Sequence, residues 1–507
     1  MIDASRTKLL SALIDATDVI RVSGDANIPI SGIAYNSNDV QSGDLFVALR
    51  GGYTDGHLYL EKAIANGAIA LMVEEAAALD VPTLVVRDSR ASLADVSARF
   101  FDDPSRELKI VGITGTDGKT STSLLAEAML ARSGKRTGLI GTVSIKIGDE
   151  TVDHETRQTT PESLEIQRML RRMVEAGVEW VVLEATSHGL DLHRLDHVEF
   201  DIGAVTNITH EHLEHHGTIA AYWRAKAQLF ERIDRDGGCA VVNADDEGAM
   251  SVLPYCENLA VMRFGIEQAD VDLAAHDISL DIHGSRFRLT APSTSETVES
   301  PLLGQFNVSN ALCAAGIAMA AGVDIETIIE AIEHPPVIAG RMASIDEGQP
   351  FKVIVDYAHT PASLEKVLTL LRSLEDHGRL IIVSGSAGER DVAKRAIQGS
   401  VCAQFADISV FSNEDPRNEP AEEIISQIAA GAKSKGAIEG ETFYQIVDRK
   451  EAVFHAMSLA RPGDTVLLAG KGHERSIIWN GVKHPWDEAA VARQALAALG
   501  FGKGKQT

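Results

Sequence analysis

Short apolar runs alternate with stretches of helical periodicity through most of the chain. Runs of strand length lie at residues 109–114, 180–185, 204–208 and 239–243, and later at 353–357, 380–384, 408–412 and 465–469. Apolar positions at helical spacing lie between them, at 121–132, 163–176 and 361–374. Buried strands that alternate with helices are typical of parallel sheets covered by helices. The pattern therefore predicts an α/β protein.

Two breaks divide this pattern into three blocks. The polar stretch 102–106 precedes a strand that starts a new α/β unit, and the Pro335-Pro336 pair ends a helix before another strand. We therefore expect domains at 1–107, 108–338 and 339–507, a number in keeping with the 507 residues. Residues 270–292 alternate apolar and polar positions, which indicates an antiparallel ribbon within the middle block.

Charge and cysteine usage narrow the class of function. The chain has 47 Lys and Arg against 73 Asp and Glu, a net charge of −26, which disfavours general binding to nucleic acid or anionic lipid. It has no run of eighteen apolar residues and no secretory signal at its start. The four cysteines form no CxxC pair, which argues against a disulfide framework. We expect a cytoplasmic monomer without nucleic-acid partners or membrane insertion.

A glycine-rich turn lies between an apolar run and a helix. Backbone N–H groups in such a turn bind phosphate oxygens, a lysine reaches the β- and γ-phosphates, and a threonine hydroxyl ligates Mg²⁺. The standard spacing requires glycine where this chain has Ile113, so we interpret the turn as a variant phosphate loop. The alternative is a tight turn with a chance Gly-Lys-Thr. The loop residues are Gly115, Thr116, Asp117, Gly118, Lys119, Thr120 and Ser121.

Seven of the seventeen histidines lie between residues 188 and 216. In one interpretation, His210, His212 and His215 form a zinc hydrolase site. In a second, one histidine ligates the Mg²⁺ of the nucleotide site. In a third, the histidines are solvated at a polar helix start. The phosphate loop favours the second interpretation, and Glu184, at the end of a predicted strand, is placed to meet the same ion.

Ordered motifs extend from about residue 112 to 474. They are GTDGKTST, EATSHGL, TNITHEHLEHHGT, VVNADDE, GQFNVSN, GRM, DYAHTPASLEKVL, GSAGERD and GKGHE, and SGDLFVALRGGYTDGH precedes them. The chain resembles the Mur ligase family, and within it the MurE type, which adds the third residue of the peptidoglycan stem peptide. The resemblance implies an N-terminal UDP-sugar-binding α/β domain, a central P-loop ATPase-like domain with a parallel sheet, and a C-terminal Rossmann-like domain that binds the amino acid.

The resemblance also implies a reaction. ATP would phosphorylate the γ-carboxylate of D-Glu in UDP-N-acetylmuramoyl-L-Ala-D-Glu, and the amine of a free diamino acid would attack the acyl phosphate. Such an enzyme is an ADP-forming ligase of peptidoglycan precursor synthesis, with roles in cell shape and division. Positioning and neutralisation of developing charge are what the protein must supply.

The family's motifs assign roles to single positions of this chain. The implied catalytic residues are Lys119, Glu184, His212 and Lys226, and the implied Mg²⁺ ligands are Thr120, Glu184, His212 and Lys226 as a carbamate. Beyond the loop, the implied ATP contacts are Asn307, Asn310, Arg341, Asp356 and His359. The UDP-sugar peptide would contact Ser37, Thr159, Thr160, Ser187 and Arg194, and the amino acid would contact Arg390, Glu414, Asp415, Arg417, Gly470 and Glu474. The sequence departs from the family pattern at Asn36, Asn38 and Glu211.

The segment Glu414-Asp415-Pro416-Arg417 bears on which amino acid is added. Enzymes of this type that use meso-diaminopimelate carry D-N-P-R there. Asp415 replaces a neutral amide with a carboxylate, which attracts a distal ammonium and repels a second carboxylate. We therefore expect L-lysine or ornithine rather than meso-diaminopimelate, although Arg417 favours a carboxylate. The alternatives are a ligase such as folylpolyglutamate synthase or cyanophycin synthetase, the zinc hydrolase, and a non-enzymatic nucleotide-binding module.

Overall fold

The computed structural model describes residues 6–51, 54–75, 79–152, 158–209, 211–233, 237–268, 270–292, 294–374 and 378–502. The chain divides into two compact units. One comprises Met1–His276, Leu289–Glu296 and Ser309–Ile332, and the other comprises Asp277–Arg288, Thr297–Val308 and Glu333–Thr507. The division into three domains at residues 107 and 338 stays a prediction.

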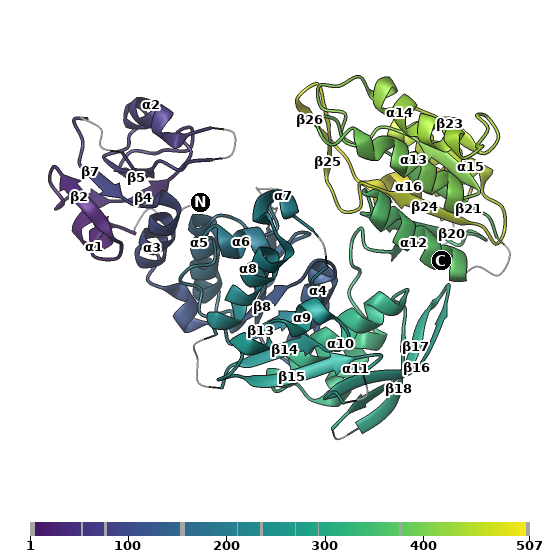
Figure 1. The fold of residues 1–507 in the computed structure, drawn as a ribbon, viewed down its shortest axis with the longest axis horizontal. Helices are drawn as coiled ribbons and strands as arrows, with labels where there is room; N and C mark the ends of the chain where they lie inside the picture. Colours follow the sequence, from purple (N-terminus) through teal and green to yellow (C-terminus); the bar gives the residue numbers. More distant parts are fainter. Residues whose placement is uncertain are drawn as a thin grey trace. The chain divides into compact units, whose positions relative to one another are not determined.

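The first 107 residues carry a five-stranded sheet in the order β2-β7-β6-β5-β4 (Figure 1). Its strands are Val19–Ser23, Thr83–Val86, Ala70–Val73, Asp44–Val47 and Gly32–Ala34 in that order. β2 is antiparallel to β7, and the other pairs are parallel. A short pair, β1 (Lys8–Leu9) and β3 (Pro29–Ile30), and three helices complete this part: α1 (Leu10–Ile14), α2 (Leu60–Ala65) and α3 (Ser89–Phe100).

The central sheet has eleven strands in the order β11-β10-β9-β12-β8-β13-β14-β15-β16-β17-β18. Its strands are, in that order, Glu150–Val152, Ile145–Ile147, Thr137–Ile140, Trp180–Glu184, Lys109–Thr114, Ile202–Val205, Cys239–Asn243, Ala260–Gly265, Leu273–Asp281, Gly284–Ala291 and Thr294–Ser300. The strands from β9 to β15 pair in parallel. Because only two residues join the neighbouring strands β16 and β17, these run antiparallel, as expected for a ribbon at 270–292.

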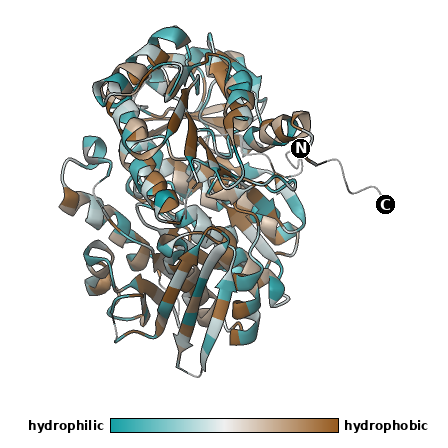
Figure 2. Cartoon of the chain, turned by 90° about the vertical axis from the view of Figure 1, so that its right-hand side faces the viewer, coloured by the Kyte–Doolittle hydropathy of each residue, from teal (hydrophilic) through white to brown (hydrophobic). Residues whose placement is uncertain are grey.

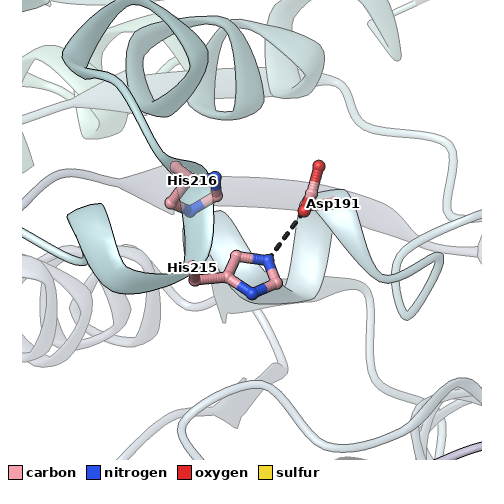
Figure 3. A group of neighbouring side chains, drawn as sticks. All are labelled: Asp191, His215 and His216. Atoms are coloured by element: carbon pink, nitrogen blue, oxygen red, sulfur yellow. Dashed lines mark hydrogen bonds and ion pairs between the residues drawn. The ribbon is translucent and has the colours of Figure 1, made fainter.

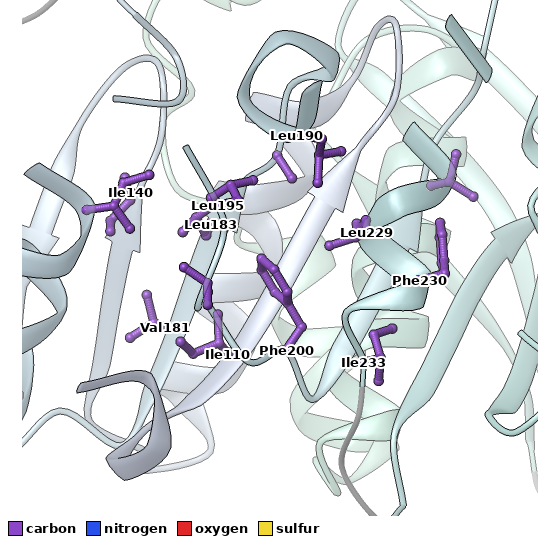
Figure 4. Packing of buried hydrophobic residues seen from close by; sticks show 14 of the residues in the cluster. Ile110, Ile140, Val181, Leu183, Leu190, Leu195, Phe200, Leu229, Phe230 and Ile233 are labelled. Atoms are coloured by element: carbon purple, nitrogen blue, oxygen red, sulfur yellow. The ribbon is translucent and has the colours of Figure 1, made fainter. Parts of the chain in front are cut away.

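Helices connect the parallel strands. They are α4 (Lys119–Arg132), α5 (Ser163–Glu175), α6 (Ser187–Asp191), α7 (Leu213–His216), α8 (Ile219–Glu231) and α9 (Glu247–Met250). Two further helices, α10 (Gln305–Ala320) and α11 (Ile325–Glu333), follow the last strand of this sheet. Figure 4 shows Phe200, Leu229 and Phe230 in the core beside the strands. Gly112 on β8 permits this packing, because a Cβ there would lie 2.5 Å from Leu229 Cδ1. The helix α8 is thereby held close to the strand that leads into the phosphate loop.

The second unit contains a six-stranded sheet in the order β19-β20-β24-β21-β22-β23. Its strands are Ala343–Ser344, Lys352–Asp356, Thr465–Ala469, Leu380–Ser384, Ile408–Phe411 and Phe443–Gln445, all parallel except β19. One apolar cluster joins it to α12 (Pro361–Leu374), α13 (Ala393–Phe405) and α14 (Ala421–Ser434). A separate cluster joins it to α15 (Arg449–Leu459) and α16 (Glu488–Ala498). Helices on two faces of a parallel sheet make this a doubly wound, Rossmann-like fold. A hairpin of β25 (Ser476–Trp479) and β26 (Val482–Pro485) is added to it.

The predicted α/β class is confirmed. Figure 2 shows brown, hydrophobic stretches on inner strands and mixed colours along the helices and on the lower strands, which is the pattern of sheets packed against amphipathic helices. One predicted strand, 204–208, is misplaced, because β13 covers Ile202–Val205. Thr206 and Asn207 leave the sheet and bond instead to the phosphate loop. Among the described residues, no helix is long and apolar enough to cross a membrane.

Candidate active site

The phosphate loop connects β8 to α4, as the sequence predicts. Gly118 has a φ of 85°, and a Cβ there would lie 2.3 Å from Asn310 Oδ1, so this position favours glycine. Asn207 follows β13, the neighbouring strand in the sheet, and closes the loop. Its carbonyl accepts a hydrogen bond from Thr116 N at 2.8 Å, and its Oδ1 accepts one from Asp117 N at 3.0 Å. Lys119 Nζ donates to the carbonyls of Gly115 and Thr116 at 2.8 and 2.9 Å.

A buried carboxylate lies beside the first turn of α4. Glu184, at the end of β12, accepts a hydrogen bond from Thr120 Oγ1 at 3.0 Å. Thr142 contacts both of its oxygens, with N to Oε1 at 3.0 Å and Oγ1 to Oε2 at 2.8 Å. Hydroxyl and carboxylate oxygens are the ligands that Mg²⁺ prefers. Thr120 and Glu184 therefore fit a divalent cation next to the phosphate loop.

Lys226 on α8 reaches the same loop from the other side. Its side chain is 1% exposed, and Nζ donates to the carbonyl of Gly115 at 2.7 Å. The ammonium lies over the ring of Tyr222, 4.7 Å from the centroid. Burial, and then the nearby charge of Lys119, lower the pKa of Lys226 well below its usual range. This environment favours loss of a proton from the amine relative to an exposed lysine, and the neutral amine is the form that acts as a nucleophile.

The histidines gather around α6 and α7. His212 is partly exposed and lies near Glu214, with Nδ1 3.3 Å from Oε1. His188 stacks on His215, with ring centroids 4.3 Å apart. Burial, followed by the charge of His215, lowers the pKa of His188 to about 4. His210, which the zinc hydrolase interpretation requires, lies outside the described residues.

Four of the five residues predicted to hold the sugar peptide lie on two segments. Thr159 and Thr160 precede α5, and Ser187 and Arg194 follow β12. Thr160 Oγ1 donates to the carbonyl of Glu184 at 2.8 Å, and Thr159 Oγ1 accepts from Thr142 Oγ1 at 3.0 Å. Arg194 donates to the carbonyl of Thr160 and pairs with Glu162, each at 3.0 Å. The buried Ser187 begins α6, whereas Ser37 lies buried in the N-terminal sheet region. Four of these five positions thus lie in one region near the end of β12, where Thr160 bonds to the main chain of Glu184.

A buried carboxyl group nearby makes stability depend on pH. Burial raises the pKa of Glu165, which is hydrogen-bonded to Tyr35, from 4.5 to about 7. Because the folded state holds this proton more tightly than the unfolded chain, stability is greatest below about pH 4.5 and falls as the pH rises to about 7. The rise in the pKa of Glu165 corresponds to a loss of about 3 kcal/mol in the free energy of unfolding between low and high pH.

Glu165→Gln should remove that part of the pH dependence. Between about pH 5 and about pH 8, thermal melting should show a smaller loss of stability in the variant than in the wild type. Glu61→Gln, at an exposed position on α2, should behave like the wild type. An equal loss in wild type and Glu165→Gln would contradict the assignment.

The second unit carries the remaining predicted ATP contacts except Asn310, which belongs to the first unit and lies beside Gly118. Asp356 ends β20 and accepts hydrogen bonds from the N–H groups of Met342 and Ala358, both at 2.8 Å. The Arg341 guanidinium lies over the ring of Tyr357, 5.0 Å from its centroid. His359 Nδ1 is 2.9 Å from the Tyr357 carbonyl. The side chain of Asn307 donates to the carbonyl of Leu303, just before α10. The predicted ATP residues are thus divided between the two units.

The predicted amino-acid contacts gather after β22 and β24. Asp415 Oδ1 accepts from Lys471 Nζ at 3.0 Å and from Ile478 N at 2.8 Å, and Lys471 also pairs with Glu474. Burial raises the pKa of Glu414 to about 7. Gly470 has a φ of 105°, and a Cβ there would lie 2.8 Å from Glu414 Oε2.

Arginines complete this group. Arg417 is held by backbone bonds to the β25–β26 hairpin, with N donating to the Ile478 carbonyl at 2.9 Å. Arg390 is exposed on the segment before α13. The second unit therefore combines three carboxylates, a buried lysine and a backbone-held arginine around the ends of β22 and β24, two parallel strands separated by β21.

Comparison with known proteins decides the family. Residues 29–117 match the Mur ligase family catalytic domain, residues 113–318 the Mur ligase middle domain, and residues 340–472 the Mur ligase glutamate ligase domain. A UDP-N-acetylmuramyl-tripeptide synthetase from Roseiflexus is 46% identical over 94% of this chain and 96% of its own. The chain belongs to the Mur ligase family.

Further relatives agree with the MurE type of Mur ligase. A UDP-N-acetylmuramoyl-L-alanyl-D-glutamate–2,6-diaminopimelate ligase from Bacillus licheniformis is 40% identical over 97% of this chain and 99% of its own. A solved structure of a ligase with the same printed name superposes with a TM-score of 0.68 at 30% identity, covering 98% of this chain and 100% of the other. Mur ligases are ATP-dependent, ADP-forming ligases, so the predicted enzyme class is confirmed, and the zinc hydrolase and non-enzymatic alternatives are set aside.

Several residues of this Mur ligase site were missed in the sequence. Thr142 lies in no motif that suggests a role, yet it contacts both oxygens of Glu184. Asn207 and Tyr222 hold the phosphate loop, since Tyr222 Oη is 3.0 Å from Thr116 Oγ1. Lys471 was within the GKGHE motif but was not singled out. The available signal in the sequence was Glu474, an acidic residue three positions after Lys471 in the same motif.

Proposed function

We propose that this ligase joins a free diamino acid to UDP-N-acetylmuramoyl-L-Ala-D-Glu in peptidoglycan precursor synthesis. The observation that carries the proposal is the arrangement of Lys119, Thr120, Glu184 and Lys226 around one phosphate loop. The names of the Roseiflexus and Bacillus relatives support this substrate. A free carboxylate is a poor acyl donor, and phosphate transfer from ATP supplies the leaving group that an amine can displace.

The side chains of the first unit would perform three tasks. The N–H groups of the loop and Lys119 would hold the β- and γ-phosphates of ATP. Thr120 and Glu184, together with His212, would hold Mg²⁺, which neutralises charge on the phosphates during transfer. Arg194 and the threonines 159 and 160 would position the peptide carboxylate, with the Arg194–Glu162 pair fixing the direction of the guanidinium.

Lys226 would act as a carbamate. Its neutral amine adds to the carbon of CO₂ and loses one proton, which yields an anionic carbamate whose oxygens can ligate a second Mg²⁺. Two observations support this: the side chain is buried beside the phosphate loop, and its pKa is lowered by that burial. The modification places an anion beside the cation of Lys119, which is a favourable contact between opposite charges.

We further propose that the diamino acid is L-lysine or ornithine. Glu414, Asp415 and Glu474 bring three carboxyl groups to this region. Lys471 pairs with two of them, Asp415 and Glu474, so the carboxyl groups outnumber this lysine. Oε2 of Glu414 is buried and has no hydrogen-bond partner among the described residues. A substrate ammonium would satisfy this oxygen, whereas a second substrate carboxylate would be repelled.

The test is phosphate release from ATP in the presence of Mg²⁺ and UDP-N-acetylmuramoyl-L-Ala-D-Glu, with L-lysine, ornithine or meso-diaminopimelate supplied separately. The product mass identifies the amino acid added. Turnover with L-lysine or ornithine alone supports both proposals. Turnover with meso-diaminopimelate alone keeps the ligase and overturns the amino-acid preference. Absence of turnover with all three would overturn the substrate assignment.

Asp415→Asn should shift the preference toward meso-diaminopimelate. The substitution removes a negative charge near the amino acid but keeps an oxygen that can accept from Lys471 and Ile478 N. We expect the ratio of kcat/KM for meso-diaminopimelate over L-lysine to rise by about tenfold or more. Asp407→Asn is the matched control, because Asp407 bonds to Arg372 and Leu380 N on the same sheet. An unchanged ratio in Asp415→Asn would show that Asp415 does not set the preference.

A further inference from the structure

The histidine-rich region contains a group of side chains to which the reaction proposed above assigns no role. Asp191 ends α6, and His215 and His216 end α7 (Figure 3). One ligand atom from each lies within 4.8 Å of the other two, and this is the one such group of three among the residues that the structure describes. The four-residue α7 thus presents both of its last side chains toward α6.

The chemistry of this group suits a transition metal rather than magnesium. Two imidazoles and one carboxylate are typical ligands of Zn²⁺, whereas Mg²⁺ prefers oxygen atoms and water. We propose that Asp191, His215 and His216 form a site for a divalent transition-metal ion of the Zn²⁺ type, with water in the fourth position. The site is distinct from the Mg²⁺ site at Thr120 and Glu184, with which it shares no ligand.

Distances support convergence on one ion. His215 Nε2 lies 2.8 Å from Asp191 Oδ2, so these two groups already meet. Two ligands, each about 2.0 Å from a tetrahedral zinc ion, lie about 3.3 Å apart. A separation below 4.8 Å therefore requires only small side-chain movements for all three to bind.

His216 adds an independent observation. Its Nε2 is buried and has no hydrogen-bond partner among the described residues. A buried imidazole nitrogen without a partner is costly, and coordination of a cation would satisfy the ring. His188 stacks on His215, with 29° between the ring planes, and limits the orientations available to it. The ring orientations are therefore restricted before any ion arrives.

A metal ion here would join two loops that carry proposed catalytic groups. α6 follows the strand that ends at Glu184, and α7 follows His212 directly. Coordination by Asp191 on one helix and by the two histidines on the other would fasten these segments to each other. The site itself does not depend on the substrate proposed above, so its test is separate from that of the ligase reaction.

The experiment is calorimetric titration of Zn²⁺ into the full-length protein in excess Mg²⁺, with Co²⁺ absorption as a second readout. The wild type should bind one Zn²⁺ and show the visible bands of four-coordinate Co²⁺. Asp191→Asn and His215→Gln should each weaken Zn²⁺ binding by about 100-fold or more, since even outer partners of a metal ligand contribute 10- to 100-fold. Bound Zn²⁺ should also raise the melting temperature of the wild type but not of His215→Gln.

His197→Gln is the matched control. His197 forms an ion pair with Asp95 at 2.7 Å, which resembles the His215–Asp191 pair but belongs to no metal-ligand group among the described residues. This variant should bind Zn²⁺ like the wild type. Unchanged Zn²⁺ binding in both Asp191→Asn and His215→Gln would overturn the proposal. Loss of binding in His212→Gln alone would overturn it as well, because it would place the ion on His212.

Discussion

Lys226→Ala should lower the rate of ligation by about a thousandfold or more. The side chain is buried, donates to the Gly115 carbonyl and, as a carbamate, would supply an anionic ligand beside the transferring phosphate. Loss of a single group that stabilises charge in a transition state lowers kcat by about 10²- to 10³-fold. Here the variant would also lose a proposed ligand of the second Mg²⁺, so we expect a larger decrease. Phosphate release and product mass measure the effect.

Lys226→Arg distinguishes the carbamate from simple positive charge. Arginine keeps a cation at this position but does not form a carbamate at accessible pH, because its guanidinium stays protonated. We expect it to be as inactive as Lys226→Ala. Lys109→Ala, on β8 and half exposed, should keep full activity. Wild-type activity in Lys226→Arg would remove the carbamate from the mechanism, and ¹³C NMR after addition of labelled bicarbonate observes the modification directly.

Glu488→Gln should destabilise the second unit by about 3 kcal/mol or more. Arg449 and Glu488 are both fully buried and pair at 2.8 Å, and Arg449 also donates to the carbonyls of Asn413 and Ala469. Removal of one charge from a buried pair leaves the other uncompensated, which typically costs 3–5 kcal/mol. For a unit of this size the melting temperature should fall by about 10 °C.

Calorimetry measures this decrease, because it resolves separate unfolding transitions and a chain with several domains need not unfold in one step. Glu439→Gln serves as control, because its pair with Lys433 is half exposed and contributes little. The double variant Arg449→Met with Glu488→Met should lose less stability than the two single losses combined, because no buried charge remains. An unchanged calorimetric profile in Glu488→Gln would show that the pair is not needed for stability.

Strands with a continuous apolar run could be predicted closely. The runs at 109–114, 239–243, 380–384 and 465–469 coincide with β8, β14, β21 and β24. Their inner positions are buried on both faces of parallel sheets and are apolar, and polar residues such as Lys109, Asn243 and Ser384 mark their ends. β13 was misplaced because Ile208, which is apolar and buried, follows the end of the strand rather than belonging to it.

Candidate site residues could be located in the sequence where a recognisable motif contains them. Thr120 and Glu184 come from two motifs far apart in the chain, but each motif marks the end of a strand, and parallel strands bring such ends to one edge. Thr142 and Asn207 act through backbone N–H groups and carbonyls as well as side chains. Such contacts depend on the exact path of the loop, and no residue pattern in one sequence reports it.

The backbone bonds between Arg417 and the β25–β26 hairpin have a consequence for protein engineering. Ile478 binds the segment 414–417 twice, through its N–H to Asp415 and through its carbonyl to Arg417, although Asp415 and Ile478 are 63 positions apart. With the role proposed above for residues 414–417, the choice of amino acid would be a joint property of two distant stretches of chain. A graft of residues 414–417 into another ligase should transfer the preference only when residues 476–485 travel with it.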